Sequence, residues 1–210
     1  MYIPSPFKED RIDVLHAAMR EAGAATLVSM TPDGLFASHA PLLLDSRIGP
    51  FGTLTGHLAK ANPHTRAADP AVETLVIFYG PSGYITPSYY AAKREHGKVV
   101  PTWNYIAIHA HGMLEMFDDA DRLLDVVTRL TDTHEALRAE PWAVSDAPPD
   151  FARAMLRSIV GISLRITRLE GKVKMSQNRP AVDIDGVIDG LTRDNRADLA
   201  AAVFRVRPPT

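Results

Sequence analysis

The amino-acid sequence predicts an α+β protein in which six or seven mostly antiparallel strands form a β-barrel that carries peripheral helices. Three observations support this prediction. Short β-prone stretches follow one another with tight turns between them, helical periodicity is confined to a few separate segments, and no strand–helix alternation or G-x-G-x-x-G motif indicates a Rossmann domain. With 210 residues, 46% of them hydrophobic, the chain is long enough to bury a substantial core.

The first half of the chain supplies most of the predicted strands. Residues 25–30 and 35–44 flank a turn with proline and Asp-Gly, and this pattern is typical of a hairpin. Residues 51–59 predict a third strand. Residues 73–80 form a nearly continuous apolar strand, and residues 83–90 are again β-prone.

The second half of the chain mixes long strands with helices. Residues 99–117 predict one long strand, and residues 160–177 predict a final strand. Helices are predicted at residues 10–22, 118–138, 150–159, 182–191 and 197–206. We expect a barrel domain with its peripheral helices over residues 1–178, followed by a helical tail over residues 179–210 that packs on the barrel or on a dimer partner.

Composition narrows the class of protein. There are no cysteines, which excludes disulfides, thiolate metal sites and cysteine nucleophiles. The formal net charge is -2 and no run of Lys and Arg exceeds two residues, so charge does not support direct DNA binding. The polar start of the chain and the short apolar runs predict a cytoplasmic protein that does not associate with a membrane.

The stretch GHLAKANPH, residues 56–64, has the composition of an anion-binding turn. A strand that leads into a helix start exposes backbone N–H groups, and such groups bind phosphate. Lys60 adds a positive charge, and His57 and Asn62 can donate hydrogen bonds. The alternative is an ordinary strand-to-helix turn with polar surface residues, and this stretch alone favours that alternative.

Two further stretches are rich in ligand-binding side chains. Residues 83–105 gather five aromatic rings together with Ser88 and Lys93, which suits a flat ring ligand or a subunit interface. An aromatic core with a hairpin loop explains the pattern about as well. Residues 171–179, GKVKMSQNR, concentrate hydrogen-bond donors where a strand ends, and the alternative there is a solvated strand end.

Metal binding and hydrolytic catalysis have little support in the sequence. His109 and His111 would lie on one face of a strand and could chelate a metal, but no third ligand is nearby in the sequence. We therefore predict no metal site. No G-x-S-x-G motif is present, so the catalytic residues, if the protein is an enzyme, are unknown.

Five motifs in fixed order resemble the PaiB family, described as FMN-binding negative transcriptional regulators. The motifs are SHAPLLL, GHLAKANPH, GYITPSYYAAK, VPTWNY and KMSQNR, and the resemblance covers nearly the whole chain. It implies a split β-barrel similar to pyridoxamine phosphate oxidase, a homodimer, and FMN bound in the cleft between the subunits. One departure is the pair Tyr89–Tyr90, where we expect tryptophan followed by tyrosine.

The resemblance also implies a set of FMN contacts. They are His39, His57, Lys60, Asn62, Ser88, Lys93, Trp103, Asn104, Lys174, Ser176, Gln177 and Arg179. The function expected is an FMN-binding protein of the PaiB type that senses redox state or acts as an FMN-dependent oxidoreductase. Two alternatives stay open: a repressor that acts without flavin chemistry, and a haem or metal protein on the same barrel that uses His39, His57, His109 or His111.

Overall fold

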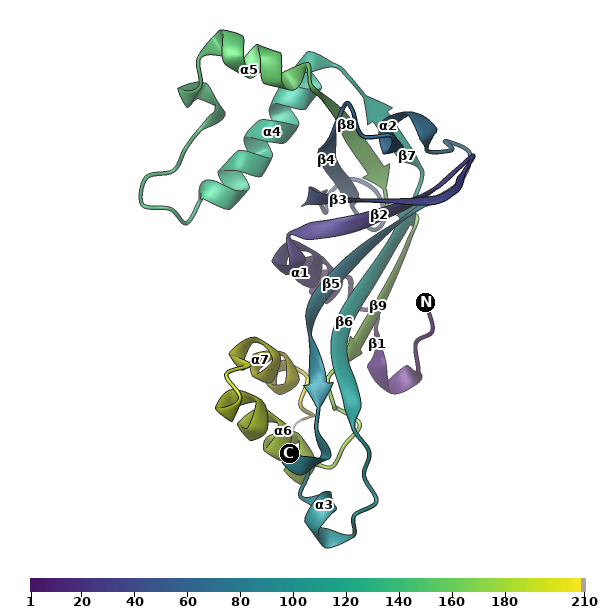
Figure 1. Ribbon diagram of the computed structural model, residues 1–210, viewed down its shortest axis with the longest axis vertical. Coiled ribbons are helices and arrows are strands. Elements are labelled where there is room, and N and C mark those ends of the chain that lie inside the picture. Colours follow the sequence, from purple (N-terminus) through teal and green to yellow (C-terminus); the bar gives the residue numbers. More distant parts are fainter. Residues whose placement is uncertain (209–210) are drawn as a thin grey trace. The chain divides into compact units, whose positions relative to one another are not determined.

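The computed structural model describes residues 1–208 and confirms the α+β class (Figure 1). Its strands are β1 Lys8–Glu9, β2 Ala24–Thr31, β3 Gly34–Asp45, β4 Thr53–Ala59, β5 Thr74–Ile85, β6 Thr102–Gly112, β7 Leu114–Phe117, β8 Ile159–Arg165 and β9 Arg168–Lys174. Its α-helices are α1 Ile12–Ala22, α2 His64–Ala67, α3 Ala92–Glu95, α4 Ala120–Glu135, α5 Pro149–Leu156, α6 Ala181–Arg193 and α7 Ala197–Arg205. Short 3-10 turns lie at η1 Ser5–Phe7, η2 Pro87–Tyr89 and η3 Val144–Asp146.

The chain folds into two compact units. Unit 1 contains residues 1–11, 79–108 and 170–208, and unit 2 contains residues 12–78 and 109–169. In unit 1 the hydrogen-bonded strand order is β1-β9-β6-β5, and in unit 2 it is β5-β2-β3-β4-β8-β7. Strands β5, β6 and β9 each contribute residues to both units.

The predicted hairpin of unit 2 is confirmed. Strands β2 and β3 pair in antiparallel register from Ala24–Pro41 to Thr31–Gly34. Gly34 adopts a φ of +106°, which side chains rarely tolerate, so the Asp-Gly turn needs glycine there. Alternate residues of β2 are buried, as expected for a sheet with one packed face.

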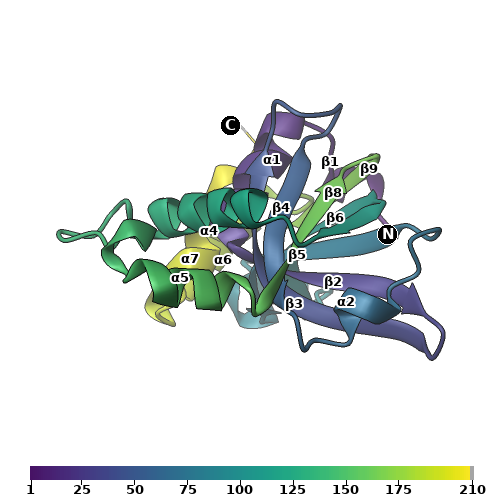
Figure 2. The ribbon, with the colours of Figure 1, turned by 90° about the horizontal axis from the view of Figure 1, so that it is seen from above.

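Helix α4 covers strands of unit 2. Its residues Leu123, Val126 and Leu130 form a buried cluster with Phe117 of β7. Gly161 of β8 leaves room for that ring, because a Cβ there would lie 2.2 Å from a carbon of Phe117. Helices α4 and α5 lie side by side in both ribbon views (Figures 1 and 2).

The structure divides two of the predicted strands. The long strand predicted at residues 99–117 is interrupted at Met113, which separates β6 from β7. The strand predicted at residues 160–177 turns after Arg165 and becomes β8 and β9. Gly112 lies against this turn so closely that a Cβ would come within 2.2 Å of the Arg165 carbonyl oxygen. Conversely, the two β-prone stretches at 73–80 and 83–90 form the single strand β5, which ends at Ile85.

Unit 1 is built around the two C-terminal helices, which confirm the predicted helical tail segments. Side chains of α6 and α7 form one buried cluster with β5, β9 and the residues that follow them. Its members include Ile85, Tyr90, Val173, Met175, Ile184, Val187, Leu191, Leu199 and Val203. The domain boundary predicted at residue 178 stays a prediction. None of the helices in residues 1–208 combines the length and apolarity that a membrane span requires.

Candidate functional site

The turn between β4 and α2 is anchored by a buried chain of hydrogen bonds. The Asn62 amide nitrogen donates to the Ser38 hydroxyl at 3.0 Å, and Ser38 lies 2.9 Å from His64 Nδ1. The other ring nitrogen of His64 lies 2.8 Å from the Ser29 hydroxyl, which contacts Thr74 at 2.6 Å. The stretch GHLAKANPH is therefore fixed to strands β2, β3 and β5.

His64 is the centre of this network and has no exposed surface. Burial lowers its pKa from the ordinary histidine value, so the imidazole is neutral near pH 7. Each group is satisfied once if Ser38 donates to Nδ1 and the Nε2 hydrogen is donated to Ser29. The Phe36 ring packs edge-on against the imidazole. Asn62 and His64 therefore serve to position the turn.

Most backbone N–H groups of this turn are occupied, contrary to the expectation of a free amide cradle. The His64 N–H donates to the Asn62 side chain at 3.0 Å, and the Lys60 N–H donates to the Ser158 carbonyl at 2.8 Å. Those of Thr65 and Arg66 donate to carbonyls within the turn. The groups left to bind an anion are therefore mainly the side chains.

Two cations lie at the exposed edge of the anchored turn. Lys60 and Arg66 are both exposed, and a guanidinium nitrogen of Arg66 donates to the Lys60 carbonyl at 3.4 Å. Within residues 1–208, neither side chain has a carboxylate within 4.0 Å. This pair of unneutralised cations suits a phosphate.

The two other predicted contacts of unit 2 lie on strands. His57 alternates with the buried residues of β4 and shares a face with Thr55. His57 Nδ1 and Thr55 Oγ1 are both buried without a hydrogen-bond partner, and burial lowers the pKa of His57. His39 on β3 is exposed, and its Nδ1 lies 2.9 Å from the Thr26 hydroxyl of β2.

Unit 1 holds the remaining predicted contacts, and four of them are occupied within the protein. Asn104 is fully buried and donates to the Ser176 hydroxyl at 2.9 Å. Ser176 has a φ of +65°, so this bond holds a tight turn. Gln177 accepts from the Met175 N–H at 2.7 Å, and Lys174 donates to the Thr102 hydroxyl. These residues form the turn rather than a free donor surface.

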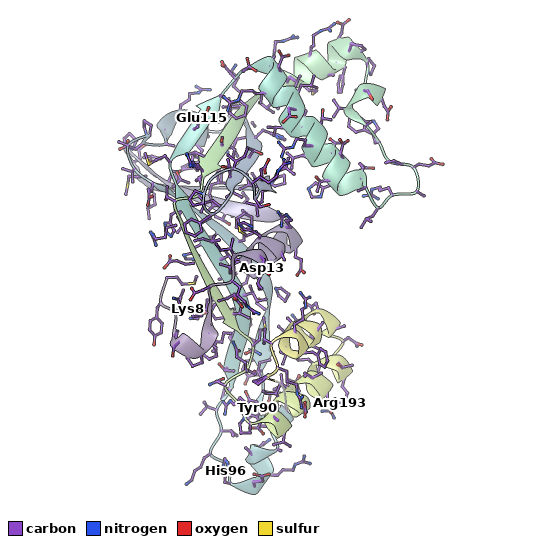
Figure 3. The ribbon with its side chains drawn as sticks, turned by 180° about the vertical axis from the view of Figure 1, so that it is seen from behind. Lys8, Asp13, Tyr90, His96, Glu115 and Arg193 are labelled. Carbon is purple, nitrogen blue, oxygen red and sulfur yellow. The ribbon has the colours of Figure 1, made fainter. Side chains whose placement is uncertain are left out.

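The other four predicted contacts of unit 1 present accessible groups. The Arg179 guanidinium carbon lies 4.6 Å from the ring centre of Tyr90. Trp103 is half exposed and lies beside Tyr84. Lys93 Nζ donates to the Ser88 hydroxyl at 3.1 Å. Tyr90 and Arg193 of unit 1 are labelled in Figure 3.

His109 and His111 lie on β6 with their ring centres 6.3 Å apart. His111 Nδ1 lies 3.0 Å from an Arg168 nitrogen. Because a guanidinium only donates, the lone pair of that ring nitrogen is engaged. This contact gives no support to a metal role for His111 Nδ1.

Sequence reasoning missed Ser29, Ser38, His64, Thr74 and Arg66. The first four are linked by hydrogen bonds between residues up to 45 positions apart, so no local sequence pattern predicts them. Arg66 could have been found, because it follows Asn62 by four residues and one helical turn places these two residues on the same side of the helix. The structure thus adds one cation to the candidate site and explains why the turn carries histidine and asparagine.

The fold is a split β-barrel of the α+β class, and solved structures share it. The flavocytochrome Anf3 from Azotobacter vinelandii aligns over 79% of this chain and 67% of its own, with a TM-score of 0.59 and 13% identity. The FAD and heme binding protein from Mycobacterium smegmatis aligns over 80% and 73%, with a TM-score of 0.56 and 16% identity. At these identities the likeness shows the fold.

The family follows from sequence comparison. Residues 1–168 match the model of the family described as "Putative FMN-binding domain". The chain is also 31% identical over 194 residues to protease synthase and sporulation protein PAI 2 of Bacillus subtilis, covering 92% of this chain and 90% of that protein. The chain belongs to this FMN-binding-domain family, and the resemblance to PaiB is confirmed.

Proposed function

We propose that the protein binds FMN and that unit 2 holds the phosphate through Lys60 and Arg66. The observation that carries this proposal is a rigid turn with two cations that have no acidic partner among the described residues. A phosphate monoester has a charge of about −1.5 to −2 near pH 7, which two cations balance. The membership of the FMN-binding-domain family supports the same ligand.

We propose that the ring system runs along β3, where Ser38 points to the anchored turn and His39 to the opposite, exposed face of the β2–β3 hairpin. Met30 and Leu35 are paired across this hairpin and expose 41% and 74% of their surfaces. The Thr26–His39 pair lies on the same two strands and supplies polar groups. A flat ring with one apolar and one polar edge fits such a surface. Flavin, when bound, supplies hydride or electron transfer, and the side chains orient and tune it.

We propose that FMN lies between two copies of the chain, as the family resemblance implies. Unit 1 carries exposed aromatic side chains that suit an interface, among them Tyr84 and Trp103 at 53% and 50% exposure. Arg179 and Trp103 are the contacts that we assign to the second copy. Light scattering should give twice the mass of one chain, and Trp103→Ala should shift the protein toward the monomer.

A role in transcriptional control would work through the flavin or through a partner protein. The formal net charge of -2 argues against a strong phosphate footprint on DNA. A gel shift at nanomolar protein that weakens with salt would contradict this proposal.

The direct test is quenching of flavin fluorescence on titration of FMN into the purified full-length protein. We expect saturable binding, weakened about 10-fold or more by Lys60→Ala, because a charge-assisted hydrogen bond contributes roughly 1.5–3 kcal/mol. Arg66→Ala should act in the same direction. Lys98→Ala is the matched control, since Lys98 is an exposed lysine of unit 1.

Two outcomes would contradict the proposal. Absence of any quenching would remove FMN as the ligand, and haem would become the next titration. Equal binding by the Lys60→Ala, Lys98→Ala and unaltered proteins would leave FMN as the ligand but remove its phosphate from the β4–α2 turn.

A further inference from the structure

Unit 1 contains a cavity of about 760 Å³ between the segment that follows β5 and helix α6. Three cations line it: Lys93 and Arg94 from α3, and Arg193 from the end of α6. One carboxylate, that of Asp189, lines it as well. Residues 94 and 193 are about a hundred positions apart, so tertiary folding alone brings these charges together.

The wall of the cavity is built by close packing. A Cβ on Gly186 would lie 2.1 Å from the Tyr89 carbonyl oxygen, and a Cβ on Gly190 would lie 2.2 Å from the Tyr89 ring. Helix α6 therefore needs glycine at both positions to admit Tyr89. The Tyr89 hydroxyl donates to Asp194, and burial together with that carboxylate raises the Tyr89 pKa to about 12. This packing holds the lining side chains in place.

The cations of the cavity are not neutralised by neighbours. Among residues 1–208, none of Lys93, Arg94 and Arg193 has a carboxylate within 4.0 Å. Together with Asp189 they give the lining a formal charge of +2. Like charges gathered around one cavity repel each other, and an anion between them removes that repulsion.

We propose that this cavity is a second ligand site, distinct from the proposed flavin site, for a small molecule that bears a phosphate group. A phosphate dianion matches the charge of the lining, and the two guanidinium groups can bind its oxygens in pairs. Ser88, held by Lys93, and Thr192 offer hydroxyl groups to the rest of the molecule. The volume is in the range of about 300–1,000 Å³ typical of small-molecule sites.

The site lies only partly within the matched part of the family: Lys93 and Arg94 fall inside it, whereas Arg193 falls outside it. Helix α6 follows residue 168, where the match to the family model ends. Ser88 and Lys93 were predicted as flavin contacts, and this proposal assigns them to the second ligand. Because FMN also carries a phosphate, the experiment must separate the two sites.

The test is calorimetric titration of the full-length protein with AMP and, separately, with inorganic phosphate as probes. We expect both to bind, and the double variant Arg94→Ala/Arg193→Ala to weaken AMP binding by about 30-fold or more. The same variant should keep its circular dichroism spectrum and its FMN quenching. Lys98→Ala, an exposed lysine near the cavity in sequence, should bind AMP as the unaltered protein does.

The outcome of competition decides between one site and two. The proposal predicts that Lys60→Ala weakens FMN and leaves AMP binding unchanged, and that saturating AMP does not displace FMN. Displacement of AMP by FMN, with loss of both in the double variant, would make the cavity part of the flavin site and overturn the proposal. Failure of inorganic phosphate and AMP to bind up to roughly 10 mM would overturn it as well.

Discussion

The two units place their polar groups in opposite ways. Unit 2 buries a chain of neutral hydroxyl, amide and imidazole groups around His64, whereas unit 1 gathers exposed cations around a cavity. Unit 2 contains 11 Lys and Arg against 16 Asp and Glu, a formal charge of −5, while unit 1 contains 12 against 9, a charge of +3.

This difference separates two uses of polar side chains. In unit 2 most polar members of the β4–α2 turn satisfy one another, so the turn is rigid and only Lys60 and Arg66 remain to meet a ligand. In unit 1 the aromatic and glycine packing supplies the rigidity, and Lys93, Arg94 and Arg193 have no carboxylate within 4.0 Å among the described residues. A polar side chain within a motif is therefore not necessarily one that contacts the ligand.

The largest expected loss of stability comes from truncating a buried leucine in the core of either unit. Leu199→Ala in unit 1 and Leu54→Ala in unit 2 each remove a side chain that is at most 1% exposed, and each should cost about 2–5 kcal/mol of the free energy of unfolding. If the two units unfold independently, amide hydrogen exchange should become faster in α6 for the first variant and in β8 for the second. Equal increases in both units for either variant would mean that they unfold as one.

His64→Gln should cost about 2 kcal/mol, because Ser29 or Ser38 then loses one of its two hydrogen bonds in a buried site. Burial places the folded-state pKa of His64 below its unfolded value of about 6.5. The unfolded chain therefore takes up the proton first, and stability present above pH 6.5 is lost as the pH falls below it.

The measurement is the free energy of unfolding in urea between pH 7.5 and pH 5.5, values chosen to span roughly one unit on either side of the histidine pKa. The variant should show a shallower fall than the unaltered protein. His134→Gln, at the exposed end of α4, is the control and should keep the original slope. An unchanged slope in His64→Gln would show that the network does not hold a neutral imidazole.

The smallest expected effect concerns a helix start. Asp119 caps α4 of unit 2 by accepting from the Arg122 N–H at 2.8 Å, whereas α6 of unit 1 begins after Pro180 without a side-chain cap. Asp119→Ala should lower stability by about 1 kcal/mol, and Asp118→Ala, its exposed neighbour, by much less. Thermal unfolding of both variants checks this, and equal shifts would argue against a capping role.

The fold was predictable where local signals decide it. The β2–β3 hairpin follows from its Asp-Gly turn, and α4 follows from its apolar periodicity and acidic first turn. The continuation of β5 through Gly80 and the break at Met113 depend on contacts with other strands, and residue patterns do not encode these.

The site was predictable only as a set of motifs. The stretch around Lys60 stands out by composition, but the roles of its members depend on partners such as Ser38 and Ser29, which lie far away in the sequence. The same holds for Arg193, which lines the same cavity as Lys93 because α6 packs on Tyr89. The sequence shows which side chains can bind a ligand. The fold is needed to tell which of them contact the ligand and which of them hold the turn in place.

The most direct test of the central claim is a crystal structure of the protein grown with FMN. We predict electron density for the flavin phosphate beside Lys60 and Arg66, with the ring system along β3 near His39. Density for the flavin in the cavity beside Arg94 and Arg193, or at neither place, would contradict the assignment of the flavin site to the anchored turn of unit 2.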